Sequence, residues 1–227
     1  MNRRPRFWRA ALTVAWKDLL TEWRSREAFS AMLVFALLVI FIFNFALELK
    51  PAARAEISAG ILWVTLCFAG ALGLNRAWVS EKDRGCLDGL LLAPVDRAAL
   101  YFGKLFSGWL ILMLIAAVLL PIYGLLYNQN LILPGLLLFI ALGVEGYLAV
   151  GTLLAAMAVQ ARSRDLLLPV LLFPVTLPAL IAAVKASSTL LSGLPWVDVQ
   201  PWLMLLLAFD LIFTVVAWLA FDIVMEE

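Results

Sequence analysis

The stretch LFSGWLILMLIAAVLLPIYGLLY, residues 105–127, decides the fold class, because it is predominantly apolar and carries no charged side chain. A helix rises about 1.5 Å per residue, so this stretch is long enough to cross the roughly 30 Å hydrocarbon core of a bilayer. Five other runs have comparable length and character. The six runs are 28–47, 57–79, 105–127, 131–160, 166–184 and 202–224. The sequence therefore predicts an all-α polytopic membrane protein with six transmembrane helices.

The composition of the 227 residues excludes a soluble globular protein. Hydrophobic residues make up 65% and charged residues 15%, whereas soluble domains have about 45–50% and about 25%. The connections between the runs are short, which leaves no room for a nucleotide-binding or catalytic domain. We therefore expect residues 1–227 to form a single transmembrane domain. A net charge of +1 gives no indication of nucleic-acid binding.

Basic residues are unevenly distributed between the two sides of the predicted membrane domain. Fourteen Lys and Arg side chains fall before the first run, at 76–104 and at 162–164, whereas Lys50, Arg54 and Lys185 fall on the other side. Because Lys and Arg in short loops remain in the cytoplasm, this asymmetry predicts that both termini are cytoplasmic.

The segment before the first run, residues 1–27, has the pattern of an amphipathic helix. Large apolar side chains recur there at spacings of three and four residues: Trp8, Leu12, Trp16, Leu19, Leu20 and Trp23. Tryptophan and basic residues suit the headgroup level of a membrane. We expect an interfacial helix, and a role in docking a partner is compatible with that position.

The connection at 80–104 carries a second amphipathic pattern. Leu87, Leu90 and Leu91 fall at i, i+3 and i+4, and Pro94 would end a short helix there. Two interpretations fit this pattern. The leucines insert into a groove on a partner protein, or they fold back onto the ends of the chain's own helices.

Several motifs resemble a known family. The order of acidic residue, Gly, Leu, acidic residue, Leu run and Pro after the second span resembles the coupling element of ABC-2-type permeases. Further motifs lie at 17–19 and 24–27, 60–63, 73–76 and 85–97, and the prolines Pro169, Pro174 and Pro178 are spaced along the fifth run. In their order and spacing, these pieces resemble more closely the CcmB family, the membrane subunit of the haem exporter of cytochrome c maturation.

The resemblance implies a non-catalytic permease subunit in the bacterial inner membrane, where it forms a homodimer within a larger complex. A separate ABC subunit would bind and hydrolyse ATP, and the partners would be a haem-handling membrane subunit and a periplasmic haem chaperone. Hydrolysis would drive haem export or release of the loaded chaperone. The resemblance assigns these contacts to the ATPase: Glu81, Asp83, Gly85, Leu87, Asp88, Leu90 and Leu91. The alternative within the same fold is an ABC-2-type exporter of a lipid or drug.

The residues that ligate metals and haem are scarce. The chain has no histidine, which removes the commonest metal ligand and the usual axial ligand of haem iron. Only Met, Cys or Tyr of this chain could reach haem iron. Cys67 and Cys86 show no CxxC spacing, so they are read as unpaired thiols. We expect no metal site and no cofactor bound by this chain, with haem present only in the complex.

Two acidic residues interrupt the apolar runs, Glu145 between Gly143 and Gly146, and Asp210 in the last run. A carboxylate in hydrocarbon costs about 2.5–3.5 kcal/mol on insertion scales. Each should therefore hydrogen-bond across a close helix contact or line a wet cavity. An intramembrane enzyme using them as an acid/base pair has little support, because no GxGD, HExxH or GxSxG motif is present.

Three prolines, Pro169, Pro174 and Pro178, lie in the fifth run and predict a kinked or irregular helix. After that run, residues 194–202 contain two tryptophans and two prolines. They predict a re-entrant or short helical piece at the membrane surface.

Overall fold

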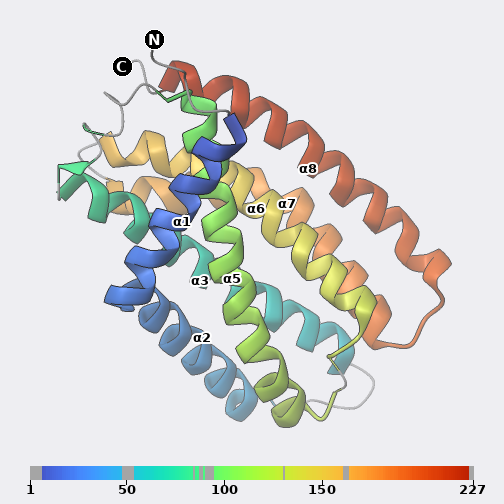
Figure 1. Cartoon of the computed structure of the whole chain (residues 1–227). Helices are drawn as coiled ribbons and strands as arrows, with labels where there is room; N and C mark the ends of the chain where they lie inside the picture. The colour runs from blue at the N-terminus through green and yellow to red at the C-terminus, as the bar shows by residue number, and fades with distance from the viewer. Residues whose placement is uncertain are drawn as a thin grey trace.

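The computed structural model describes residues 7–47, 54–83, 85, 86, 89, 95–129, 131–160 and 164–224. These ranges contain helices and no strand, which confirms the predicted all-α class. The helices, coloured along the chain in Figure 1, are α1 (Phe7–Ser25), α2 (Glu27–Ala46), α3 (Arg54–Asp83), α5 (Arg97–Tyr127), α6 (Pro134–Gln160), α7 (Arg164–Leu191) and α8 (Trp196–Val224).

Six of these helices are long and apolar enough to span a membrane: α2, α3, α5, α6, α7 and α8. The chain is therefore a multi-pass membrane protein. Most of the apolar stretch of α3 and of α6 is buried inside the bundle, whereas α2 and α8 expose most of theirs. The exposed apolar surface is what a lipid-facing helix requires.

Buried aromatic side chains join the inner helices through hydrogen bonds. The Tyr147 hydroxyl of α6 donates to the Cys67 carbonyl of α3 at 2.7 Å, and the Tyr101 hydroxyl of α5 donates to the Ala149 carbonyl of α6 at 3.0 Å. The Trp63 indole of α3 donates to Ser187 Oγ of α7 at 2.9 Å. Each ring thus fills core volume and satisfies its own polar group.

Helix α1 lies across α5 at one end of the bundle (Figure 1). It packs through its small residues, such as Ala11 and Ala15, which are buried. The predicted tryptophan stripe points away from the protein, with Trp8, Trp16 and Trp23 exposed by 69%, 64% and 72%. This arrangement suits an interfacial helix whose large apolar side chains face the membrane.

Helix α7 extends from Arg164 to Leu191 with all three prolines inside it, so none of them ends the helix. One local prediction differs from the structure. The expected re-entrant piece is largely the first two turns of α8, which begins at Trp196 and continues through Pro201. Pro201 is the sixth residue of α8, so it removes the backbone donor to the Val197 carbonyl, and the helix nevertheless continues through it.

Candidate functional site

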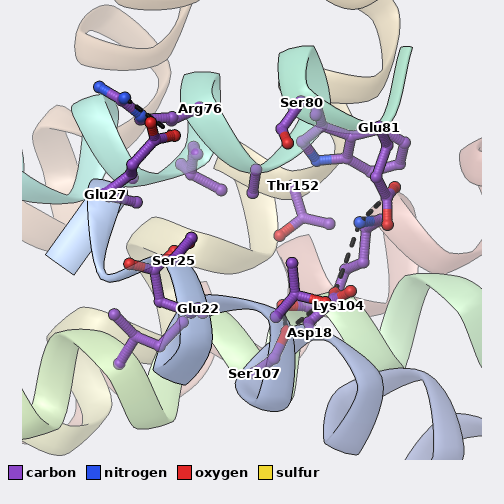
Figure 2. Close-up of a pocket in the computed structure, with 18 of the residues that line it drawn as sticks. Asp18, Glu22, Ser25, Glu27, Arg76, Ser80, Glu81, Lys104, Ser107 and Thr152 are labelled. Atoms are coloured by element: carbon purple, nitrogen blue, oxygen red, sulfur yellow. Dashed lines mark hydrogen bonds and ion pairs between the residues drawn. The ribbon is translucent and has the colours of Figure 1, made fainter. Parts of the chain in front are cut away.

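A cleft of about 500 Å³ lies at the end of the bundle where α3 ends and α5 begins. Its walls come mainly from α1, α2, α3 and α5, with Leu148 and Thr152 contributed by α6. Figure 2 shows the polar side chains that surround it. The connection predicted to contact an ATPase leaves the bundle beside this cleft, since Cys86 and Gly89 are among the lining residues.

One side of the cleft is a network of ion pairs centred on Lys104 of α5. Its side chain is only 4% exposed, and its Nζ lies 2.6 Å from Glu81 Oε2 and 3.4 Å from Asp18 Oδ2. The same ammonium group lies 4.7 Å from the centre of the Trp78 ring. The Ser107 hydroxyl donates to Asp18 Oδ2 at 3.3 Å. Carboxylates from α1 and α3 therefore neutralise a buried cation of α5.

Lys17 of α1 extends the network towards solvent. Its Nζ pairs with Glu81 and lies 3.0 Å from Asp18 Oδ1. Burial alone would lower the pKa of Lys17, but the Asp18 and Glu81 carboxylates together raise that pKa above its usual 10.5. Lys17 is therefore charged at neutral pH. We call Lys17, Asp18, Glu81 and Lys104 the charge cluster.

The opposite side of the cleft holds the junction between α1 and α2. Arg26 has the left-handed conformation there, with φ of 53°, so the chain turns sharply between the two helices. Glu22 Oε1 accepts a hydrogen bond at 2.7 Å from the backbone N–H of Phe29, in the first turn of α2. Arg76 of α3 lies 3.2 Å from Glu27 across the cleft. Figure 2 shows this pair opposite the charge cluster.

The residues that flank segment 84–94 also contact the ends of more distant helices. Lys82 at the end of α3 donates to the Val159 carbonyl near the end of α6. Arg97 at the start of α5 donates to the Asp222 carbonyl near the end of α8 at 3.0 Å. Together with the charge cluster, these contacts link both flanks of the segment to α1 and to the C-terminal ends of α6 and α8.

The seven residues predicted to contact an ATPase have different surroundings. Glu81 is held in the charge cluster with a side chain 12% exposed, whereas Asp83 is exposed at the end of α3. Gly85 has φ of 65°, a conformation that favours glycine, and turns the chain directly after α3. Leu87, Asp88, Leu90 and Leu91 lie outside the described residues.

The two intramembrane acids, which are far apart in sequence, are brought together by α6 and α8. Thr214 of α8 donates to Glu145 Oε1 at 3.0 Å. Asp210 of α8 packs against Gly146, the residue after Glu145, where a Cβ atom would lie 2.1 Å from Asp210 Oδ1, and its two buried carboxyl oxygens have no hydrogen-bond partner among the described residues. Glu145 and Thr214 also line a second, mostly apolar groove of about 400 Å³. Both acids thus lie at the contact between α6 and α8, and Glu145 also borders a groove.

Sequence reasoning did not single out Asp18, Trp78, Lys104 or Ser107 as site residues. Two features of the sequence could have indicated them: Lys104 lies directly before an apolar run, and Asp18 is an acidic residue in the amphipathic N-terminal helix. Their pairing depends on how α1 crosses α5, which the periodicity of either helix does not define.

Six apolar helices of spanning length, an amphipathic α1 with exposed tryptophans and a charged cleft at one end define a multi-pass membrane protein. Comparison with known proteins then identifies the family. The family model described as CcmB protein matches residues 9–226, and the chain belongs to this family.

Similar proteins carry a common name. The chain is 30% identical over 183 residues to "Heme exporter protein B" of Pseudomonas aeruginosa, covering 80% of this chain and 82% of that protein. It is also 30% identical over 171 residues to the protein of that name from Paracoccus denitrificans, covering 75% and 78%. The similarity thus extends over most of both chains.

Proposed function

We propose that this chain is the membrane subunit of an ABC-type complex that exports haem for cytochrome c maturation. Membership of the CcmB family supports the haem-export assignment, as do the names of its relatives. In this proposal the chain is not catalytic, and a separate ATP-binding subunit hydrolyses ATP. The complex resides in the bacterial inner membrane with both termini of this chain in the cytoplasm.

The observation that carries the coupling proposal is the set of contacts around segment 84–94. Glu81 and Lys104 pair with one another and with residues of α1, while Lys82 and Arg97 bind the ends of α6 and α8. A displacement of the segment would therefore act on α1, α3, α5, α6 and α8 together. Buried ion pairs suit this role, because breaking one is costly and the linked helix ends move as a unit.

The proposed input is ATP-driven closure of the ATPase against segment 84–94. Leu87, Leu90 and Leu91 would supply the apolar contact area, and Asp83 and Asp88 would orient the partner. The output is movement of the spans, which exports haem or releases a haem-loaded periplasmic chaperone. A haem-handling membrane subunit and a second copy of this chain complete the proposed complex.

Replacement of Leu87, Leu90 and Leu91 together by serine tests the coupling. We expect this variant to lose co-purification of the ATPase from native membranes, because the three leucines supply the apolar area that the proposed contact buries. The measurement is the amount of ATPase recovered per amount of tagged chain, with equal membrane insertion verified for each variant.

The matched control is Leu194→Ser in the connection between α7 and α8. Leu194 is also an exposed leucine, with 50% exposure, but it lies at the opposite end of the bundle. The control should retain the ATPase. Undiminished recovery with the triple variant would contradict the proposed docking segment, and an ATPase recovered without haem proteins would favour an exporter of a lipid or drug.

A further inference from the structure

The cleft described above is amphipathic in a way that ATPase coupling does not explain. Its charged side chains include Lys17, Glu27 and Arg76, which are 42%, 62% and 47% exposed and therefore lie at the mouth. The other lining residues include five apolar side chains from four helices: Met32, Leu74, Ile111, Leu112 and Leu148. A ligand that fits must combine a polar head with an apolar body.

The position of α1 puts the mouth of the cleft at the membrane surface. The exposed tryptophans of α1 belong at headgroup level. On the same helix, Lys17, Asp18, Thr21 and Glu22 line the cleft. Lipid headgroups are therefore the polar groups most abundant at its mouth.

The charge of the lining selects among headgroups. Three cationic residues, Lys17, Arg76 and Lys104, face four anionic ones, Asp18, Glu22, Glu27 and Glu81. An anionic head would add a negative charge to a lining that is already slightly negative. A head that carries both a phosphate and an ammonium group can instead satisfy both kinds of side chain.

A polar group inside the cleft also lacks a partner. Thr152 is 1% exposed, and its Oγ1 has no hydrogen-bond partner among the described residues. Figure 2 shows Thr152 between the charge cluster and the Arg76–Glu27 pair. A buried hydroxyl without a partner is costly, and the ester carbonyl of a glycerolipid is an acceptor that would lie below the headgroup.

We propose that the cleft binds one zwitterionic phospholipid with a primary ammonium group, of the phosphatidylethanolamine class. Its phosphate interacts with Lys17 on the side of the charge cluster, and its ammonium group interacts with Glu22 and Glu27 on the opposite side. The Thr152 hydroxyl donates to an ester carbonyl, and an acyl chain lies along the apolar wall. The site goes beyond the proposed haem export, and its occupancy does not depend on that function.

Native mass spectrometry of the purified full-length chain, with lipids added to the detergent, tests this site. We expect one bound dioleoyl-phosphatidylethanolamine per chain, with about tenfold weaker binding of dioleoyl-phosphatidylglycerol, because the latter lacks the charge-assisted hydrogen bonds of the ammonium group. Dioleoylglycerol, which lacks a phosphate, should also bind at least about tenfold more weakly. Equal binding of the three lipids would overturn the proposal.

Gly108→Leu places a side chain in the cleft and should lower phosphatidylethanolamine affinity by at least about tenfold. The added Cβ has ordinary contacts, since its nearest neighbour is a Leu148 methyl group at 3.7 Å. Gly60→Leu is the matched control, because a Cβ there meets nothing within 4 Å and Gly60 does not line the cleft. Equal lipid binding by these two variants would contradict the assigned site.

Thr152→Val provides a second variant that conserves side-chain volume. We expect it to fold as the wild type does and to bind phosphatidylethanolamine about fivefold or more weakly, because one hydrogen bond is lost. Unchanged affinity would refute the role of Thr152. Haem added together with phosphatidylethanolamine should not displace the lipid. Displacement of phosphatidylethanolamine by stoichiometric haem would overturn the assignment in favour of a haem site.

Discussion

At the scale of single residues, the central feature is a buried lysine that two carboxylates neutralise. Lys104 is almost fully enclosed by Trp78, Glu81 and Asp18. An ammonium group in this environment is tolerated only when it is paired. Lys104 therefore holds α1, α3 and α5 together at the end of the bundle from which segment 84–94 leaves.

Lys104→Met should lower the free energy of unfolding by on the order of 3 kcal/mol, because it leaves two partly buried carboxylates with one lysine. The measurement is equilibrium unfolding by SDS in mixed micelles. Lys185→Met is the control, since Lys185 pairs with Glu56 at 2.8 Å in an exposed position. Its loss should cost less than about 1 kcal/mol. Equal effects of the two substitutions would show that the buried pair lacks the assigned role.

The pH dependence of stability tests Lys17. Its raised pKa means that its contribution is complete below 10.5, the usual value, and is lost as the pH rises through the higher folded-state pKa. The difference in melting temperature between wild type and Lys17→Gln should stay constant from about pH 7 to about pH 9 and shrink in more alkaline buffer. A difference that already disappears near neutrality would be inconsistent with the paired lysine.

Sequence reasoning at this scale found the acids but not their partners. Glu145 and Asp210 stand out because each interrupts an apolar run, and the structure places both at the contact between α6 and α8, Glu145 against Thr214 and Asp210 against Gly146. Lys104 lies at the edge of an apolar run, where a lysine that extends into the headgroup region is the ordinary interpretation. Lys104 is buried because α1 packs over it, and that contact cannot be predicted from the sequence around Lys104.

At the scale of helices, close contacts rather than hydrophobic periodicity define how the spans pack. Almost every position in a span is apolar, so periodicity cannot identify the face that points inward. Instead, small residues determine where two helices approach, as at Gly143 of α6, which lies against the Trp63 ring of α3. The amphipathic α1 is the exception, because the spacing of its large apolar side chains predicts which face they share.

Gly143→Ala should destabilise the chain by about 1–3 kcal/mol, because its new Cβ would lie 2.3 Å from Trp63 Cη2. The Trp63 ring has little freedom to move, since its indole N–H is bonded to Ser187. Gly60→Ala in α3 is the control and should be neutral or stabilising, because the added methyl meets open space. SDS titration compares the two, and a neutral Gly143→Ala would contradict the tight contact between α3 and α6.

At the scale of the whole molecule, the structure brings functional groups from distant parts of the sequence to one end. The six apolar helices of spanning length and the amphipathic α1 could be predicted from run length and periodicity. The cleft could not, since its lining residues come from five helices and from the connection after α3, and they come together only in the folded bundle. The side of the membrane that this end faces is a prediction from basic residues alone.

Cysteine labelling tests this orientation. Cys86 is exposed beside the cleft, whereas Cys67 is buried in α3. A membrane-impermeant maleimide should therefore label the wild type from the cytoplasmic side and not from the periplasmic side. Cys86→Ser should abolish the labelling, and Cys67→Ser should leave it unchanged. Labelling of Cys86 from the periplasm would reverse the proposed topology.

The most direct test of the central claim is purification of the tagged chain from its native membrane in mild detergent, followed by identification of its partners. The account predicts an ABC ATPase together with a haem-handling membrane protein, ATP hydrolysis and a haem absorption band in the preparation. Recovery of the intact chain without an ATPase would contradict the claim that it is the membrane subunit of an ATP-driven haem exporter.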